Sequence, residues 1–545
     1  MADQSILFEP AALATLANEH ALKDLEFFFF SLALWNSKAP TVYLYCTKAV
    51  ADYLPKFKYP GTIHIDLALE SYKGLNRQQM ERAGIWSEFQ MAKARIIELA
   101  LKSEPDTLLL DSDIIITGVI DGIDMTKDLG VSPHFMKDEI HKKYGYYNGG
   151  MLWTKNKNVP GDWIKYTRGS RYFDQASIED LAKKYSHFEF GDNYNVQAWR
   201  FYLSPKPIQP NFQVLGNNSI EYNGTPLKFF HTHFHDSRFS EFNEFVIGQL
   251  RKANMYKILA IAYRVINDAW VLTIPKQPIQ GMGRHNNDSY RELPVLFKVQ
   301  NRDIDIRFSE DTIHCWIEPN ILTYDRPTLE WCDDEIRKAS LILLGNGDVK
   351  VEGEQLKQVT KAPIKPWFFW PRRPMLLEKI LRARGILTWE NRTVGSIFIG
   401  NFENSVQARF RNTDIKWSDS IDEYHCTEGT KHKFSHEEYL MKLRSAKYGL
   451  CLRGYGSKCH REVELMAFGT VPIVADGVTT ESYMEPLIEN LHYLKVSLPD
   501  DILPKTDEIT EEQWTKMSTA CYEWYQRNVL SKNAWINMIE HILYD

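Results

Sequence analysis

The chain has 545 residues, 44% of them hydrophobic and 13% aromatic, which at about 100–200 residues per domain allows roughly three or four folding units. Its formal net charge is −6, without the basic excess that nucleic-acid-binding proteins use, so we expect no nucleic-acid partner. No apolar run reaches the length needed to cross a bilayer, so we expect no transmembrane segment.

The first elements of the chain read as the start of an α/β fold. Residues 12–18 and 41–47 are strand-like runs, and residues 24–35 form an apolar helical segment between them. In open α/β sheets a nucleotide binds beyond the carboxyl ends of the strands. The end of the first strand, at Ala17 and Asn18, is therefore the expected nucleoside pocket.

An acidic pair, Asp111 and Asp113, interrupts an apolar run. Residues 107–110 lead into the pair and residues 114–116 follow it, so both carboxylates are expected at the carboxyl edge of a buried strand. Carboxylate oxygens suit Mg²⁺ or Mn²⁺, and such an ion typically bridges protein carboxylates to substrate phosphates. A second copy of the pattern, Asp303-Ile-Asp305, lies in an alternating run and is expected to be a solvated strand face.

Further polar groups flank this pair in the sequence. The helix predicted just before it carries Lys93, whose end can face the same crevice. Asn148 and Gly149 belong to an Asn-Gly-Gly loop whose glycines would let the backbone approach a ligand closely. A later strand-like run ends in imidazoles, among them His231 and His233.

This order of features resembles the GT-A glycosyltransferases, particularly the glycogenin-like nucleotide-sugar transferases, over roughly residues 10–240. The resemblance implies that Asp111, Asp113 and a late His hold Mn²⁺ or Mg²⁺ on the diphosphate of a donor, for which we expect a UDP-sugar. His231 fits the late ligand best because it directly follows a Phe-Phe strand, and His233 is second.

The resemblance also defines an expected donor site and its chemistry. The family's Gly and Lys-Pro-Trp are absent after the late His, and Arg238 could replace the Lys. The donor-binding residues expected in this half are Ala17, Asn18, Lys93, Asp111, Asp113, Asn148, Gly149 and Arg238. The resemblance favours retention of configuration, whereas an inverting enzyme would need a base, for which Asp192 is the candidate. The alternative reading of Asp192 is an ordinary helix-start residue.

A different series of elements begins after residue 240. Residues 241–267 read as a long helical connector, and strand-like runs follow at 270–274, 312–317 and 341–344. His285, in a glycine-containing loop, is the candidate base of this half. Ser435 and Glu438 then form a capping box that begins a helix running to about residue 447.

A glycine-rich basic loop lies between a strand at 448–452 and a helix at 459–468. Its candidate donor-binding residues are Arg453, Gly454, Gly456 and Lys458 in the loop, with Arg461 and Glu464 in the helix. Such a unit directs backbone N–H groups, a helix N-terminus and basic side chains at one point, which suits a diphosphate. The alternative is an ordinary strand–loop–helix turn.

The same segment resembles the nucleotide-binding half of the exostosin-like GT-B glycosyltransferases over about residues 440–500. The matching residues are Cys451, Leu452, Gly456, Arg461, Glu464, Gly469, Pro472 and Ile473. The resemblance implies two facing Rossmann-like halves with the donor nucleotide in the C-terminal one. We expect Arg461 to contact the diphosphate and Glu464 the ribose, with no metal or other cofactor in this half.

Together these features predict an α/β chain, with a GT-A domain of Rossmann-like mixed sheet followed by a GT-B-like module. The expected boundaries are a GT-A domain at 1–240, a helical connector at 241–267, an acceptor half at 268–390, and a donor half with terminal helices at 391–545. The expected activity is that of a bifunctional hexosyl- or pentosyltransferase acting on an oligosaccharide or glycan acceptor.

Two alternatives stay open. One half could be degenerate and serve as a glycan-binding scaffold, or the chain could be a sugar nucleotidyltransferase, which also uses paired carboxylates. Seven scattered cysteines, an odd and sparse count, indicate free thiols in a reducing cytoplasm.

Overall fold

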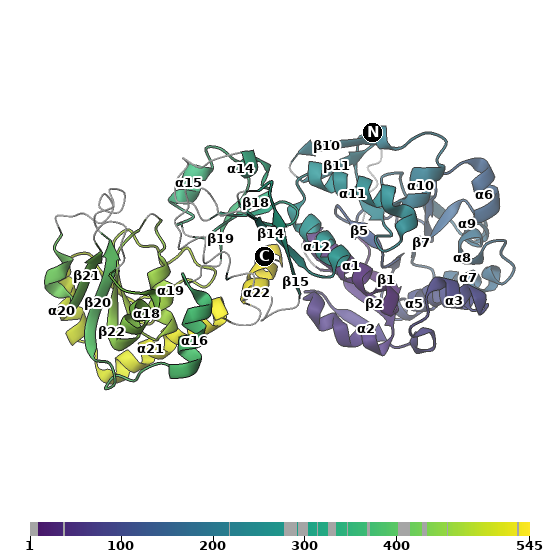
Figure 1. Ribbon diagram of the computed structural model, residues 1–545. Helices are drawn as coiled ribbons and strands as arrows, with labels where there is room; N and C mark the ends of the chain where they lie inside the picture. Colours follow the sequence, from purple (N-terminus) through teal and green to yellow (C-terminus); the bar gives the residue numbers. More distant parts are fainter. Residues whose placement is uncertain are drawn as a thin grey trace. The chain divides into compact units, whose positions relative to one another are not determined.

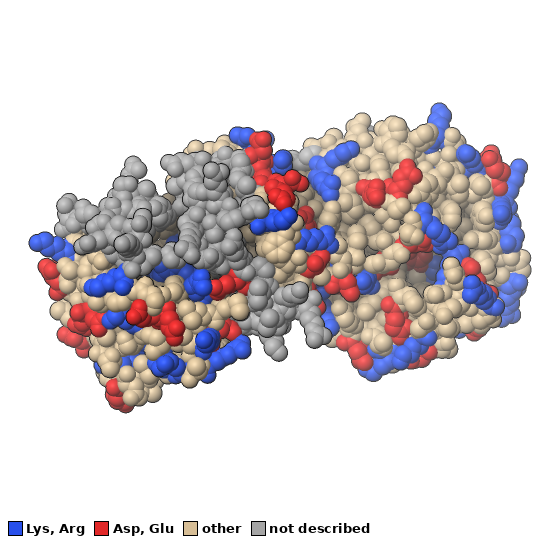
Figure 2. Space-filling view, in the orientation of Figure 1, with Lys and Arg blue, Asp and Glu red and all other residues tan. Residues whose placement is uncertain are grey.

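The computed structural model divides the chain into two compact units, Met1–Ile266 and Asn267–Asp545 (Figure 1). The residues that it describes are 9–35, 39–216, 218–276, 292, 303–312, 314–324, 334–345, 347–367, 371–401, 415–427, 433–454, 456–530 and 534–544. Among them, no helix combines the length and the apolar character needed to cross a membrane. Basic and acidic side chains are interspersed over the face of both units drawn in Figure 2.

The first unit is built on a seven-stranded sheet with the order β3-β2-β1-β4-β7-β6-β8. Its strands are β1 (Ala12–Ala17), β2 (Thr41–Cys46), β3 (Ile63–Asp66), β4 (Thr107–Leu110), β6 (Leu129–Pro133), β7 (Tyr147–Thr154) and β8 (His187–Glu189). Strands β1 to β4 run parallel, whereas β7 runs antiparallel to both β4 and β6. The sheet is therefore mixed, and its parallel part has the arrangement of a nucleotide-binding α/β fold.

Helices cover both faces of this sheet, which explains the nearly continuous apolar sequence of its central strands. One face packs against α3 (Arg77–Arg82), α4 (Trp86–Gln90), α5 (Ala92–Ala100), α7 (Val159–Thr167) and α9 (Ile178–Lys184). The other packs against α1 (Leu22–Trp35) and α2 (Lys48–Tyr53). In β1, Ala12 and Ala14 point to the first core, whereas Leu13 and Ala17 point to the second.

A second, three-stranded sheet lies next to the acidic pair. Its order is β5 (Ile114–Ile116), β13 (Phe229–His231) and β9 (Val196–Gln197). A separate small sheet contains β10 (Phe212–Gly216), β11 (Ser219–Tyr222) and β12 (Thr225–Pro226). The short helices of this region are α6 (Asp138–Tyr144), α8 (Phe173–Ala176) and α10 (Ala198–Leu203).

The expected long connector is two helices, α11 (Ser240–Lys252) and α12 (Tyr256–Asn267). The break falls at Asn254, whose φ of 59° is left-handed, a conformation that asparagine tolerates better than most residues. The amphipathic pattern continues through the break, so periodicity alone predicted one helix.

The second unit contains two sheets. The first has the order β15-β14-β16-β17-β18-β19, with β14 (Trp270–Pro275), β15 (Ile304–Ser309), β16 (Cys315–Ile317), β17 (Ile321–Tyr324), β18 (Leu341–Leu344) and β19 (Ile364–Pro366). This sheet departs from the parallel arrangement of a Rossmann-like half, because β16 is antiparallel to both β14 and β17. Residues 318–320, which join β16 to β17, are too few for a parallel crossover.

The second sheet of this unit is fully parallel. Its order is β21-β20-β22-β23-β24, with β20 (Val394–Asn401), β21 (Glu423–Thr427), β22 (Ala446–Cys451), β23 (Val471–Ala475) and β24 (Leu494–Val496). This is the doubly wound order of flavodoxin-like folds, which bind ligands at the carboxyl ends of the strands. The unit's helices are α14 (Asp334–Lys338), α15 (Glu352–Leu356), α16 (Pro374–Arg384), α18 (His436–Ser445), α19 (His460–Ala467), α20 (Ile502–Asp507), α21 (Glu511–Tyr525) and α22 (Ala534–Tyr544).

Candidate functional site

The Asp111–Asp113 segment is the point where the chain leaves the large sheet and enters the small one. It joins β4 to β5, and β5 pairs antiparallel with β13 so that Ile114 lies opposite His231. The backbone N–H of Thr232 donates to the carbonyl of Asp113 at 2.9 Å. Strand pairing thus brings the acidic pair next to the late imidazoles, although about 120 residues separate them in sequence.

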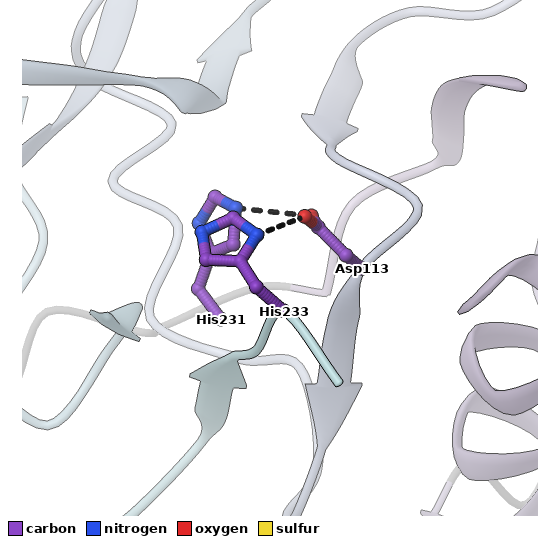
Figure 3. Close-up of side chains that lie close together, drawn as sticks. All are labelled: Asp113, His231 and His233. Atoms are coloured by element: carbon purple, nitrogen blue, oxygen red, sulfur yellow. Dashed lines mark ion pairs between the residues drawn. The ribbon is translucent and has the colours of Figure 1, made fainter. Parts of the chain in front are cut away.

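Asp113, His231 and His233 form a compact cluster of metal-capable side chains (Figure 3). Their ligand atoms lie within 4.8 Å of one another. Asp113 Oδ1 is 3.0 Å from His231 Nε2, and Asp113 Oδ2 is 2.9 Å from His233 Nδ1. One carboxylate and two imidazoles in this arrangement are suitable ligands for a divalent transition metal such as Mn²⁺.

The surroundings of the cluster fit a cation. His231 Nδ1 lies 2.9 Å from Asn195 Oδ1, and an imidazole that donates from Nδ1 keeps its Nε2 lone pair for a metal ion. Asp113 Oδ1 is buried and makes no aligned hydrogen bond within the described part of the chain. Burial raises the pKa of Asp113, but His231 and His233 lower it more, so the carboxylate stays ionised. The site therefore offers an ionised carboxylate as a ligand for a cation.

Lys93 and Asp111 lie beside the cluster as a buried ion pair. Lys93 Nζ is 2.8 Å from Asp111 Oδ1 and donates to the carbonyl of Gly149 at 3.1 Å. Burial lowers the pKa of Lys93, but Asp111 and Asp174 raise it more, so the ammonium stays charged. Asp111 Oδ2 is 4.0 Å from His231 Nε2, so Asp111 lies at the edge of the cluster and not among its three close ligands.

The Asn148-Gly-Gly segment is not the loop that the sequence predicted. It belongs to the buried strand β7. Asn148 Oδ1 accepts from the Gly150 N–H and from Asn195 Nδ2, and its Nδ2 donates to Gln197 Oε1. A Cβ on Gly149 would lie 2.4 Å from Asp174 Oδ2, so this glycine makes room for a protein carboxylate. Asn148 and Gly149 therefore contact residues that surround the site.

Gly150 is the glycine that the cluster itself requires. A Cβ at this position would lie 2.6 Å from Asp111 Oδ2 and 2.6 Å from His231 Cε1. The strand can therefore pass this close to the two side chains only without a side chain of its own.

Three other predicted residues are placed away from the cluster. Asn18 caps the short helix that follows β1, and its Nδ2 donates to two backbone carbonyls, while Ala17 is buried in the core below it. Arg238 is exposed and forms an ion pair with Asp236. In the part of the chain that the structure describes, the hydrogen bonds of Asn18 and the ion pair of Arg238 are made with residues outside the cluster.

Of the two candidate bases, the structure describes only Asp192. The Asp192 carboxylate accepts a hydrogen bond from Asn223 Nδ2 at 2.6 Å. His285 lies outside the described residues.

Sequence reasoning missed Gln197 and Asp174. Gln197 pairs with His231 in the small sheet and is buried, and its Nε2 has no hydrogen-bond partner among the described residues. Asp174 is buried 3.7 Å from Lys93 Nζ. Each stands alone in the sequence, so only the tertiary structure identifies them.

In the second unit the glycine-rich loop lies against α15. Arg453 Nη2 is 2.9 Å from Glu352 Oε1, and Ser457 Oγ donates to the same carboxylate. Gly454 and Gly456 are buried in this loop. Lys458 is 3% exposed, and its ammonium lies 4.6 Å from the centre of the Tyr483 ring.

Arg461 and Glu464 both lie on α19, but their surroundings differ. Arg461 stacks on Phe398 at 4.6 Å, and Nη2 donates to the Ile399 carbonyl. Its Nε and Nη1 have no hydrogen-bond partner among the described residues.

Glu464 is fully buried and engaged by other protein groups. It accepts hydrogen bonds from the Arg372 backbone at 2.9 Å and from the Tyr439 hydroxyl at 2.6 Å. Burial raises the pKa of Glu464, but its ion pair with Arg372 lowers it more, and the net shift is downward. In this structure the Glu464 carboxylate is thus engaged by Arg372 and Tyr439, and its expected ribose contact stays a prediction.

No protein-family model matches the chain, and no curated protein matches it. Among solved structures, the galactosyltransferase LgtC in complex with donor and acceptor sugar analogs is 16% identical, with a TM-score of 0.32, over 43% of this chain and 94% of that one. Mouse xyloside xylosyltransferase 1 is 10% identical, with a TM-score of 0.28, over 41% and 97%. The glycosyltransferase GlyE of Streptococcus pneumoniae TIGR4 is 12% identical, with a TM-score of 0.28, over 92% and 98%.

Proposed function

We propose that the first unit transfers a sugar from a nucleoside-diphosphate donor, with UDP-sugars favoured, to a glycan acceptor. The observation that carries this proposal is the cluster of Asp113, His231 and His233 with the Lys93–Asp111 ion pair at its edge. It lies at the carboxyl end of β4, where open α/β sheets bind nucleotides.

The chemistry of glycosyl transfer explains this combination of groups. When the bond to the donor diphosphate breaks, negative charge develops on phosphate oxygens and positive charge on the sugar ring. A divalent ion bound to Asp113, His231 and His233 would neutralise the charge on the phosphates. Lys93 fixes the position of Asp111 beside the same site, so this ion pair needs no reorganisation during the reaction.

The test is a screen of UDP-, GDP- and dTDP-sugars for release of free sugar by the full chain, with Mn²⁺ or with EDTA. In an Arg461→Gln background, we expect hydrolysis of a UDP-sugar that EDTA abolishes and that Asp113→Asn lowers strongly. The Arg461→Gln substitution leaves only the first unit's site intact. If hydrolysis in this background persists in EDTA, the first unit has no metal-dependent site. Release of pyrophosphate from a sugar phosphate and a nucleoside triphosphate would instead support a nucleotidyltransferase.

A second donor site, in the second unit, is favoured by Arg461. Its guanidinium is 4% exposed, yet Nε and Nη1 lack hydrogen-bond partners among the described residues. Leaving buried polar N–H groups of a charged side chain without hydrogen bonds is costly, and an anion that accepts from Nε and Nη1 would offset that cost. Lys458 and the N-terminus of α19 lie in the same loop–helix segment, as a diphosphate site requires.

On this proposal the chain is bifunctional, with metal-independent donor binding in the second unit. UDP binding in excess EDTA, measured by calorimetry, tests it. Arg461→Gln should weaken this binding by roughly tenfold or more, the worth of one charge-assisted hydrogen bond. Arg527→Gln, which removes an exposed arginine paired with Glu485, is the control and should bind as the wild type does. If EDTA abolishes all UDP binding, the second unit is better described as a scaffold.

A further inference from the structure

Two large aromatic side chains are exposed side by side on α10. Trp199 is 43% exposed and Tyr202 is 37% exposed. They are three residues apart, so they lie on the same face of the helix. Together they offer an exposed aromatic surface to a ligand.

Both rings are connected to the metal-capable cluster through Phe239. The Phe239 ring centre is 5.3 Å from that of Trp199 and 6.3 Å from that of Tyr202. The Phe239 ring centre also lies 4.7 Å from that of His233, and His233 Nδ1 is 2.9 Å from Asp113 Oδ2. A single buried ring therefore separates this aromatic pair from a cluster residue.

The pair is held in a fixed position. The Tyr202 hydroxyl accepts a hydrogen bond from the Phe242 backbone N–H at 3.2 Å. α10 begins directly after Gln197, which lies opposite His231 in the small sheet. Strand β9, which pairs with His231, therefore also fixes the start of α10, the helix that carries both rings.

Strand order separates this surface from the expected nucleoside pocket. The pocket at the end of β1 belongs to the large sheet, in which β1 adjoins β4 on one side of the Asp111–Asp113 segment. On the other side the order is β5, β13 and β9, and α10 follows β9. In strand order the Asp111–Asp113 segment therefore separates the pocket at the end of β1 from the surface on α10.

We propose that Trp199 and Tyr202 form the acceptor subsite and bind a pyranose ring of the glycan by its apolar face. This rests on the proposed function of the first unit, because it names the place of that reaction's second substrate. A pyranose presents carbon-bound hydrogens on one face and hydroxyls around its rim. Flat amphipathic rings with a polar edge complement both features.

The experiment uses the full chain and two NMR measurements with the methyl glycosides of glucose, galactose, N-acetylglucosamine and xylose. Saturation transfer from the protein detects binding of a glycoside. Line broadening by protein-bound Mn²⁺, with Mg²⁺ as the diamagnetic reference, reports whether the bound glycoside lies near the cluster. Wild type should show both effects for at least one glycoside.

Trp199→Ala should lower both signals by roughly tenfold, as expected for the loss of a stacking ring. Trp199→Phe keeps a ring and should recover most of the binding, and Tyr202→Ala should weaken it. Phe308→Ala removes an aromatic ring that is 62% exposed in the second unit, and is the matched control. UDP affinity in Mn²⁺ should stay within about twofold of wild type in all four variants, since none of them removes a phosphate contact.

Three outcomes would overturn the proposal: no glycoside binding by wild type, unchanged signals in Trp199→Ala, or a parallel loss of UDP affinity, which would place a nucleobase on these rings. Saturation transfer that depends on Trp199 without Mn²⁺ broadening would count against the metal site of the proposed function and would leave a sugar-binding surface.

Discussion

At the scale of single residues, Asp113 is the side chain on which the candidate metal site depends most. Each of its carboxylate oxygens faces one imidazole, from His231 and from His233. Removing the carboxylate leaves two neutral ligands and no charge to balance a cation. Because loss of a group that merely supports a ligand costs about 10–100-fold in metal affinity, Asp113→Ala should cost at least about 100-fold.

Calorimetric titration with Mn²⁺ in the absence of nucleotide measures this directly. Asp305→Ala is the matched control, because Asp305 belongs to the second Asp-x-Asp pattern. Its exposed carboxylate forms an ion pair with Arg307. The control should titrate as wild type does. Equal affinities for Asp113→Ala and wild type would remove the cluster from consideration as a metal site.

A substitution at Gly150 tests how tightly the strand packs against the cluster, and does not change the charge. An added methyl group would meet Asp111 and His231 at 2.6 Å, so Gly150→Ala should destabilise the first unit by roughly 1–3 kcal/mol and weaken Mn²⁺ binding. Gly161, in α7, has nothing within 4 Å of an added Cβ. Gly161→Ala should therefore be neutral or stabilising by about 0.5–1 kcal/mol. Urea unfolding of both variants, followed by Trp fluorescence, compares them; equal stabilities would mean that the strand can move away from the cluster.

At the scale of elements, the sequence predicted best what local residues determine. The capping box of Ser435 and Glu438 begins α18 as expected, because both partners lie within one turn. The strand before Asp111 was likewise predicted from its apolar run. The Asn148-Gly-Gly segment was assigned to a loop from its composition, whereas burial between β4 and β6 makes it a strand.

The sequence predicted the residues of the site only where they belong to a short, recognisable pattern. Asp111, Asp113 and the late histidines stand out in the sequence, and strand pairing brings them together. Gln197 carries no local signal, because its strand has two residues and its partner His231 is distant in sequence. The partner of Glu464 is hidden from the sequence for a related reason: Arg372 lies 92 residues earlier.

One element-scale consequence concerns α19 and pH. Burial raises the pKa of Glu462, in the first turn of this helix, from its ordinary 4.5 to about 7. The folded state thus holds this proton up to about pH 7, whereas the unfolded chain releases it near 4.5. The stability of the second unit should therefore fall as pH rises through that window, by roughly 3 kcal/mol at 1.36 kcal/mol per pKa unit.

Glu462→Gln removes the titrating group and keeps an oxygen that can accept from the Cys459 N–H. Urea midpoints at pH 5 and pH 8 test the prediction. The loss of stability between these two values should be smaller in Glu462→Gln than in wild type. An identical loss in both proteins would mean that Glu462 is ionised throughout.

At the scale of the whole molecule, the division into Met1–Ile266 and Asn267–Asp545 predicts two independent responses to ligand. Each unit has its own sheets and hydrophobic cores. A ligand that binds only the folded state raises stability by RT ln(1 + [L]/Kd), about 2.7 kcal/mol when its concentration is 100 times Kd. Each candidate site should therefore stabilise only the unit that contains it.

Expressed separately, residues 1–266 and 267–545 should each unfold in one cooperative transition. Mn²⁺ with UDP should raise the Tm of the first fragment, and EDTA should reverse the effect because the three cluster ligands lie within that fragment. UDP in EDTA should raise the Tm of the second fragment, because the donor site proposed at Arg461 uses no metal. In the intact chain, Asp113→Ala should remove the first response only, and Arg461→Gln the second only. If one fragment never responds, the chain has a single donor site; if each substitution removes both responses, the two candidate sites are not independent.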